Sequence, residues 1–457
     1  MSLIKPRLTF SQIINMNVGF FGIQYSFGLQ QTAINPLYTF LHAKPEQLPL
    51  LNLAGPMTGL IIQPLIGALS DKTWHPRWGR RKPYFLLGAL GCSLCLFLFP
   101  FCKALWMAVG LLWILDASNN TAMEPYRAFI ADKLPVDQRA LGFLTQSFFT
   151  GLGITLANIS LFVFQKLISG ETTTSTGESG IPYWVFGSFF VGAVCSIGSV
   201  LWSTSKTPEI PPTEEELKKI RERKKGLFEP FIEIAHAIRD MPQTLWQLSL
   251  VYLFQWYAMF CYWQFISLNL ADTIWHTSPE ANKTLYEEAV GWTGLVNGFY
   301  NIVTFVSAFA LVWLAKKFTA KYVHVACLVL ASLSLFILPQ IENKYLVFVP
   351  MIGFGIAWAS MMGVPYIMVV SSIPKSRYGV YMGIVNMMIV IPMILQTLTF
   401  GYIYKNFLGD HPPYAIMFAG GLLLLAALAT LRIKVGHTKE DVEEEMEEMA
   451  MPMGAGH

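Results

Sequence analysis

The sequence predicts an all-α membrane protein with twelve transmembrane helices arranged as two six-helix bundles. Hydrophobic residues fill 54% of its 457 positions and charged residues 13%, whereas a soluble domain carries roughly 25% charge. Twelve stretches approach the about 20 apolar residues that cross a bilayer, and a long polar segment follows the sixth. The stretches lie near residues 11–36, 49–70, 84–102, 104–131, 141–165, 183–204, 244–270, 288–314, 322–340, 345–371, 379–403 and 413–433.

The distribution of basic residues predicts how these helices are oriented. With the amino terminus in the cytoplasm, 25 of the 32 lysines and arginines fall on the cytoplasmic side, six fall outside and Arg127 lies within a span. This asymmetry is the positive-inside pattern of membrane proteins. Lys5 and Arg7 precede a polar first span without a small-residue cleavage site, so we expect this helix to be retained. Both termini are therefore predicted to be cytoplasmic, in a multi-pass protein of the cell membrane.

Four regions follow from the composition: a first bundle over 1–204, a cytoplasmic linker with a surface helix over 205–243, a second bundle over 244–435 and an acidic cytoplasmic tail over 436–457. A weak internal repeat supports the division. Pro125-Tyr126 and Pro365-Tyr366 lie at the exits of the fourth and tenth spans, and each pair is followed by another proline and an arginine. Repeated halves around a central site are typical of secondary transporters.

Several functional classes are disfavoured by the motifs. The chain has no Walker-type phosphate loop, which argues against an ATP-driven pump. All six cysteines fall within predicted spans, and Cys92 and Cys95 lack the second ligand pair of a zinc site. The basic residues follow membrane sidedness and form no nucleic-acid-binding patch. We therefore expect no metal, no organic cofactor and no nucleic-acid partner.

The fourth span carries a polar stripe. Asp116, Asn120, Glu124 and Arg127 are spaced so that, at ~100° per residue, they share one face of a helix. A carboxylate in hydrocarbon is costly unless it faces a partner or a wet cavity, so it marks a functional site by default. The alternative is a structural ion network that stabilises helix packing.

A loop between spans two and three has the composition of a cytoplasmic latch. An acid at a helix end is followed by a short basic segment, and the acid can accept hydrogen bonds from neighbouring helix amino termini. The residues are Gly67, Asp71, Arg77, Gly79, Arg80 and Arg81. This pattern resembles the signature loop of the major facilitator superfamily, lengthened here by roughly residues 73–76. The resemblance implies a gate; the alternative, a topology signal alone, explains the arginines but not Gly67 and Asp71.

A more specific resemblance covers roughly residues 20–140. Residues 53–71, with Gly55-Pro56 and Pro64, and residues 113–120, with Asp116 followed eleven residues later by Arg127, are similar to the plant sucrose–proton symporters and their bacterial and animal relatives. The resemblance implies proton-driven uptake of a disaccharide such as sucrose or maltose, or of a related glycoside. It implies that Asp116 is the residue that binds the proton and that Arg127 is the arginine at the end of the polar stripe.

The chain departs from that family at Glu124, where the plant proteins have a small residue. Glu124 is three residues from Arg127 and can pair with it, which leaves Asp116 to take the proton alone, or Glu124 can carry the proton itself. Asp116 and Arg127 are about 16 Å apart along a helix axis, too far for a direct pair.

A sugar site needs paired hydrogen bonds and an apolar wall, because each ring has polar edges and C–H faces. Amides and aromatic side chains in the predicted spans supply both, although each amide can instead join two helices. The candidates are Gln24, Gln30, Asn52, Asn119, Asn120, Gln255, Tyr262, Asn297, Asn301 and Trp358. The expected partners are a sugar and the lipid bilayer, with the chain acting as a monomer. Sodium coupling, uncoupled diffusion and a membrane protein that binds glycosides without moving them remain open.

Overall fold

The computed structural model describes residues 6–76, 78–168, 180–209, 211, 214, 217–218, 232, 236–370 and 378–433. Regular structure in these residues is helical, apart from one isolated bridge between His75 and Gly79. Each long helix overlaps one predicted span. The long helices are α1 (Phe10–Phe40), α3 (Ala54–Lys72), α4 (Lys82–Leu98), α5 (Leu105–Lys133), α6 (Val136–Ile168), α7 (Tyr183–Lys206), α10 (Gln243–Trp275), α11 (Lys283–Lys317), α12 (Ala320–Ile337), α13 (Phe348–Val370), α14 (Tyr378–Phe407) and α15 (Pro412–Thr430). Shorter helical turns are η1 (Pro45–Gln47), α2 (Leu48–Leu51), η2 (Phe99–Phe101) and η3 (Leu338–Gln340).

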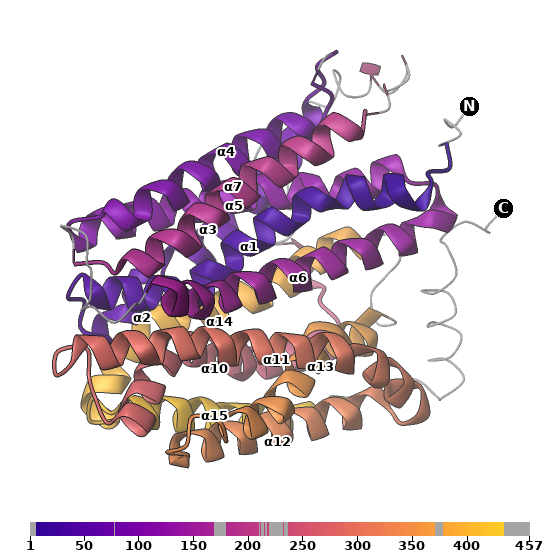
Figure 1. Cartoon of the computed structure of the whole chain (residues 1–457). Helices are drawn as coiled ribbons and strands as arrows, with labels where there is room; N and C mark the ends of the chain where they lie inside the picture. The colour runs from indigo at the N-terminus through magenta and orange to yellow at the C-terminus, as the bar shows by residue number, and fades with distance from the viewer. Residues whose placement is uncertain are drawn as a thin grey trace.

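The helices form two halves (Figure 1). In the first half α1 packs on α6 and α7, and α5 packs on α3 and α4. In the second half α10 packs on α14 and α15, and α13 packs on α11 and α12. The halves touch through α6 with α11, α3 with α14, and α1 with α10 and α11. The last long helix of the first half, α7, ends at Lys206. Most of the linker 205–243 and all of the tail 436–457 lie outside the described residues.

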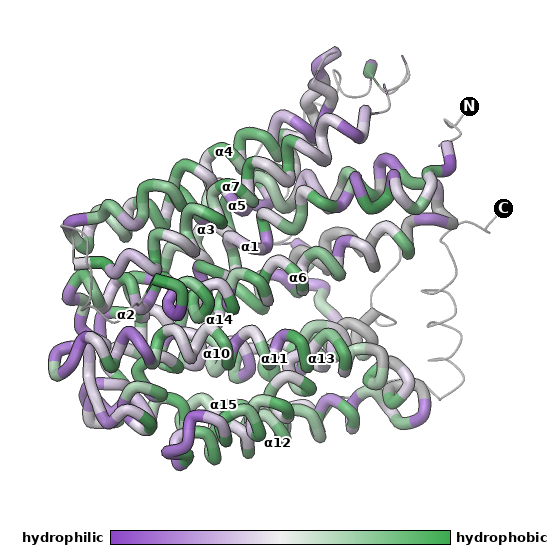
Figure 2. The backbone as a smooth tube through the Cα atoms, in the orientation of Figure 1, coloured by the Kyte–Doolittle hydropathy of each residue, from purple (hydrophilic) through white to green (hydrophobic). Residues whose placement is uncertain are grey.

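Hydropathy separates the helices into two kinds. Eight segments of the described chain are long and apolar enough to cross a membrane, and they lie in α3, α4, α6, α7, α12, α13, α14 and α15. Most of their length is green in Figure 2, with purple gathered at helix ends and loops. The other long helices, α1, α5, α10 and α11, carry buried polar side chains, among them Gln24, Asp116, Gln255 and Asn297. Buried polar groups need partners inside the protein, so these side chains, with Asn158 of α6 and Gln396 of α14, mark where a site is expected.

Glycines bring α1 very close to its neighbours. A Cβ at Gly22 would lie 2.2 Å from the carbonyl oxygen of Cys195 on α7, and a Cβ at Gly153 on α6 would lie 2.6 Å from the carbonyl oxygen of Phe21. Such distances are shorter than van der Waals contact, so only glycine permits this approach. Tight packing of this kind fixes α1, and the polar side chains it carries, against the rest of the first half.

The two halves meet at one side of the molecule. We call the side where α1 begins the termini side, and the side where α1 ends the far side. In Figure 1 the halves come together at the left, which is the far side, and spread apart toward the right. Aromatic rings close the far side: Phe40 of α1 lies 6.4 Å from Trp184 of α7 and 5.8 Å from Tyr286 of α11. Together with Glu287 these residues form what we term the far-side seal.

Candidate functional site

Asp116 lies near the middle of α5 with only 1% of its surface exposed. The amide nitrogen Nε2 of Gln30 on α1 donates a hydrogen bond of 2.6 Å to its Oδ1. Its Oδ2 is buried without a hydrogen-bond partner among the described residues. A side chain at Gly55 on α3 would come within 3.8 Å of both carboxylate oxygens. Among the described residues no cation is bonded to this carboxylate, and burial of an unpaired charge is costly.

A chain of amides leads from the next turn of α5 into the second half. Asn120 donates to the hydroxyl of Thr58 at 3.1 Å and accepts from Nε2 of Gln63 at 2.7 Å. Gln63 in turn accepts a hydrogen bond of 3.2 Å from Asn386 of α14. The helix that carries Asp116 is therefore joined to the second half through α3. Asn120 was among the predicted contacts, but no spacing in the sequence links it to Asn386.

A second polar chain joins the halves at α1 and α11. Tyr262 of α10 donates to Oδ1 of Asn297 at 2.8 Å, and Nδ2 of Asn297 donates to Thr32 of α1 at 3.0 Å. Thr32 also donates to Asn158 of α6. Asn301 donates to the backbone oxygen of Asn297 at 2.8 Å. Asn297 thus binds across the interface in this conformation, while Tyr262 bonds to Asn297 within the second half.

Other predicted sugar contacts bond within the first half. Asn119 donates to Ser26 at 3.1 Å and accepts from the Cys92 thiol at 2.9 Å, so it joins α5 to α1 and α4. Asn52 donates to the side chain of Asn35 at 2.6 Å, and Gln24 lies 3.8 Å from the Met123 sulfur. In this conformation these three amides act between helices, which is the alternative that the sequence left open.

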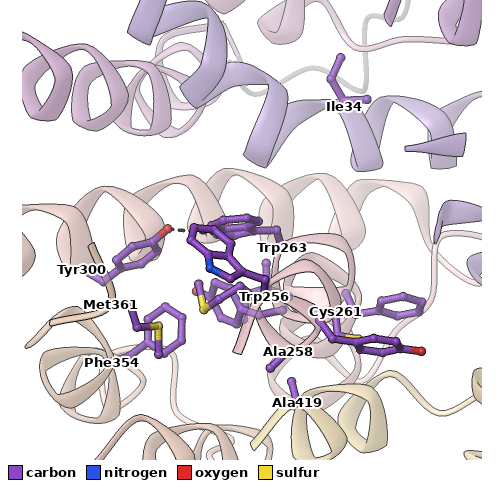
Figure 3. Close-up of a cluster of buried hydrophobic side chains, with 14 of the residues drawn as sticks. Ile34, Trp256, Ala258, Cys261, Trp263, Tyr300, Phe354, Met361 and Ala419 are labelled. Carbon is purple, nitrogen blue, oxygen red and sulfur yellow. Dashed lines mark hydrogen bonds between the residues drawn. The ribbon is translucent and has the colours of Figure 1, made fainter. Parts of the chain in front are cut away.

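Aromatic side chains of the second half form a wall that faces α1 (Figure 3). Trp358 of α13 lies edge to face with Trp256 at 5.8 Å and with Trp263 at 5.5 Å, both on α10. The indole of Trp263 donates to the hydroxyl of Tyr300 at 3.3 Å. The predictions included Trp358 and not Trp263. The signal was present, because Trp256 and Trp263 are seven residues apart and therefore share a helix face.

Two buried side chains of α10 have no hydrogen-bond partner for polar atoms among the described residues. These atoms are the indole nitrogen of Trp256, whose side chain is 5% exposed, and both amide atoms of Gln255, which is fully buried. In proteins, nearly all buried hydrogen-bond donors and acceptors have a partner. Unpaired ones are therefore candidates for contacts that a ligand completes.

The signature loop is held within the first half. Nε of Arg81 lies 2.9 Å from the carboxylate of Asp132 on α5, and its guanidinium donates to Ser70 at 2.6 Å. Gly79 has a φ of 74°, in the left-handed region that favours glycine. A Cβ there would lie 2.4 Å from the carboxyl carbon of Glu209. A Cβ at Gly67 would meet nothing within 4 Å.

Glu209 organises this loop and was not among the predicted residues. Its carboxylate accepts backbone N–H groups of Arg80 at 2.7 Å, of Arg81 at 2.9 Å and of Lys82 at 2.9 Å. These N–H groups precede or begin α4, where an anion is favourable. Glu209 follows a proline after the end of α7, so sequence spacing alone gives no link to a loop more than 120 residues earlier.

The side chains of some predicted site residues are not among those that the structure describes. The side chains of Asp71, Glu124 and Arg127 and the whole of Arg77 are not among the described parts of the chain. The backbone places Asp71 in the last turn of α3 and the other two in α5. Among the residues that are described, no three His, Cys, Asp or Glu side chains come together as a metal site would require.

Two halves of long apolar helices, joined by hydrogen-bonded amides and with a buried carboxylate in the first half, are typical of a multi-pass membrane transporter. A family model described as Major Facilitator Superfamily matches residues 16–397. The chain belongs to that superfamily.

Similar proteins agree with this assignment. The chain is 24% identical over 466 residues to the sucrose transport protein SUC4 of Arabidopsis thaliana, covering 90% of this chain and 89% of that protein. The solved structure of the nucleoside transporter NupG matches with a TM-score of 0.66 at 13% identity, over 93% of this chain and 99% of that one. A D-xylose-proton symporter matches with a TM-score of 0.61 at 16% identity, over 93% and 97% of the two chains. At these identities the solved structures support the fold alone.

Proposed function

We propose that the protein is a proton-coupled symporter that carries a disaccharide, sucrose or maltose, or a related glycoside into the cell by alternating access. The observation that carries this proposal is Asp116, a fully buried carboxylate with one oxygen held by Gln30 and the other unpartnered among the described residues. Relatives named as sucrose transport proteins support the substrate class.

The proposed topology has twelve spanning helices, both termini in the cytoplasm and a location in the cell membrane. The termini side is then cytoplasmic and the far side is external. Because Phe40, Trp184 and Tyr286 close the far side in this conformation, the structure corresponds to a carrier closed to the outside. The protein acts as a monomer, and its coupling ion is the proton, with no metal or organic cofactor.

The proposed cycle couples the proton to the sugar through their shared interface. Asp116 takes a proton while the far side is open. The neutral carboxyl costs little to bury, so the protonated carrier can close. The amide chain from Asn120 through Gln63 to Asn386 joins α5 to the second half, which ties the state of α5 to the position of that half. By linkage, proton and sugar each bind better when the other is present.

The sugar is proposed to lie between α5 and the aromatic wall of the second half. Trp256, Trp263 and Trp358 supply the apolar surface for its C–H faces, and Gln255 supplies an unpaired amide for its hydroxyls. Glu124, on the termini side of Asp116, is proposed to receive the proton on its way to the cytoplasm, with Arg127 as its ion-pair partner. The signature loop, with Gly67, Asp71, Arg77, Gly79, Arg80 and Arg81, is proposed to gate the termini side.

The test is uptake of labelled sucrose into liposomes that contain only this protein, with the interior alkaline. We expect Asp116→Asn to abolish accumulation while sugar exchange between the two sides persists, since a neutral side chain still buries but no longer carries a proton. Glu288→Gln serves as the control. Unchanged accumulation by Asp116→Asn would remove Asp116 from the coupling. The matching variant Glu124→Gln tests whether the Glu124 carboxylate also takes part in proton coupling.

The remaining alternatives give different outcomes in the same liposomes. Accumulation that follows a sodium gradient and leaves the external pH unchanged identifies sodium coupling. Exchange without accumulation in the unaltered protein identifies a facilitator. Sugar binding without exchange identifies a protein that does not transport.

A further inference from the structure

A second buried carboxylate, far from Asp116 in the chain, lies between the two halves. Glu287 of α11 belongs to the second half and is 6% exposed. The indole nitrogen of Trp184 on α7, in the first half, donates a hydrogen bond of 3.1 Å to its Oε2. Gln165 of α6, also in the first half, donates to its backbone oxygen. Oε1 is buried without a hydrogen-bond partner among the described residues.

The surroundings of Glu287 make this contact specific to the closed far side. Phe40 of the first half packs its ring on Tyr286 of the second, and the ammonium of Lys283 lies 5.8 Å from the centre of the Phe40 ring. Lys283 also donates to a backbone oxygen just before α7. These contacts, like the Trp184 hydrogen bond, join the first half to the second. Separation of the halves on the far side would therefore break them together and bring water to Glu287.

We propose that Glu287 is a second proton-binding site and that its protonation favours closure of the far side. This inference rests on the proposed alternating-access transport, in which the far side opens and closes. Comparison with the next residue, Glu288, shows why the proton-binding site is assigned to Glu287. Glu288 is only partly buried and lies 3.5 Å from Lys344 within the second half, so it is not covered by the first half.

The direction of the pH effect follows from burial. Glu287 precedes the predicted span 288–314, and burial raises the pKa of its carboxyl, while the Trp184 hydrogen bond and the charge of Lys283 oppose the rise. When the far side opens, water returns the pKa toward its ordinary value. The closed form therefore binds the proton more tightly. Closure is favoured below the raised pKa, and this preference is lost as the pH rises above it.

Other titratable groups at this end of the molecule do not replace Glu287. Lys166 of α6 lies over the ring of Phe162 at 5.8 Å, and Tyr38 and His42 lie at or just beyond the end of α1. On α7 the residue that faces Glu287 is the neutral Trp184. Lys283 is the charged group that acts on the Glu287 carboxylate.

The test measures how far-side opening depends on pH. Thr39, next to Phe40 and 6% exposed, is replaced by cysteine in the full-length protein in liposomes. The rate of its reaction with a membrane-impermeant maleimide is divided at each pH by the rate in denatured protein, which cancels the pH dependence of the thiol. Protein without this cysteine gives the background from the native thiols.

We expect the normalised rate to fall several-fold from pH 8 to pH 5, because the closed form binds the proton more tightly than the open form. Glu288→Gln should show the same fall. Glu287→Gln should react slowly at both pH values, since its neutral side chain favours closure throughout. A fall in Glu287→Gln equal to that in Glu288→Gln would overturn the proposal.

Sucrose exchange in the same liposomes separates this inference from the proposed function. A pH-dependent labelling rate that Glu287→Gln abolishes, in a protein that exchanges no sucrose, would support the gate and reject the sugar assignment. Sucrose exchange with labelling that Glu287→Gln leaves unchanged would support the sugar assignment and reject the gate.

Discussion

At the scale of single residues, unsatisfied hydrogen-bonding atoms distinguish a ligand site from helix packing. Asn119 has partners for both of its amide atoms, so it is satisfied without a ligand. Gln255 has none among the described residues, and Asp116 has a partner for one oxygen only. Because an unpaired buried polar group costs about 1–3 kcal/mol, a bound proton would stabilise Asp116 and a bound sugar would stabilise Gln255.

The aromatic wall supplies a residue-scale prediction. Trp263→Ala removes one ring of the wall together with its hydrogen bond to Tyr300. We expect the sucrose concentration for half-maximal exchange to rise about tenfold, equivalent to ~1.4 kcal/mol of binding free energy. Trp263→Phe should lose less, since an aromatic face remains. Trp246→Ala, on the same helix but 54% exposed, is the control, and equal losses in the two alanine variants would exclude a sugar-binding role.

At the scale of elements, a carboxylate joins the end of one helix to the start of another. Glu209 follows α7 and accepts three backbone N–H groups at the start of α4. Lys133 at the end of α5 donates to the backbone oxygen of Pro208 at 2.6 Å. Burial lowers the pKa of Lys133, nearby Lys82 lowers it further, and Glu209 opposes both. The first residues after α7 are thus bonded to α4 and α5 of the same half.

We expect Glu209→Gln to weaken this junction. The amide keeps the size of the side chain but loses the negative charge at the start of α4, which is worth roughly 0.3–1 kcal/mol at an exposed helix terminus and up to about 2 when partly buried. The midpoint of thermal unfolding of the purified protein should fall by a few degrees. Glu214→Gln, at an exposed position of the linker, should leave the midpoint unchanged. A midpoint that moves equally in both variants would contradict the capping role.

At the scale of the whole molecule, contacts between the halves gather on the far side and at mid-depth. Lys405 of α14 lies 3.4 Å from Glu46 near the far side, and Thr32 bonds Asn297 deeper in the interface. Close approach of backbones is part of this interface, since a Cβ at Gly294 of α11 would lie 2.5 Å from the carbonyl oxygen of Asn158 on α6. The halves therefore fit together only while that position has no side chain.

Gly294→Leu should force the two halves apart where α11 meets α6. Its side chain would meet a backbone oxygen that cannot rotate away, so the closed far side is destabilised relative to the open one. We expect maleimide labelling of Thr39→Cys to rise several-fold at neutral pH, by a shift of population between two conformations. Gly110→Leu on α5, where a Cβ meets nothing within 4 Å, is the control. Slower or unchanged labelling in Gly294→Leu would show that the contact does not set the conformation.

Local sequence patterns were sufficient for the helical class and the approximate range of each long helix, and they singled out Asp116 as a candidate site residue. Apolar stretches of fixed length mark helices, and a carboxylate among apolar residues is conspicuous without any knowledge of its neighbours. The signature loop and the family were also predicted from the sequence, since both are recognised by short contiguous motifs.

Which polar groups pair with one another is visible only in the folded structure. Gln30 reaches Asp116 across 86 positions of the chain, and Glu209 reaches the start of α4 across more than 120. Packing also separated amides that join helices from those left unpaired among the described residues, and it placed Glu287 between the halves. Such pairings depend on how helices pack and rotate against one another, and this three-dimensional arrangement has no counterpart in residue spacing.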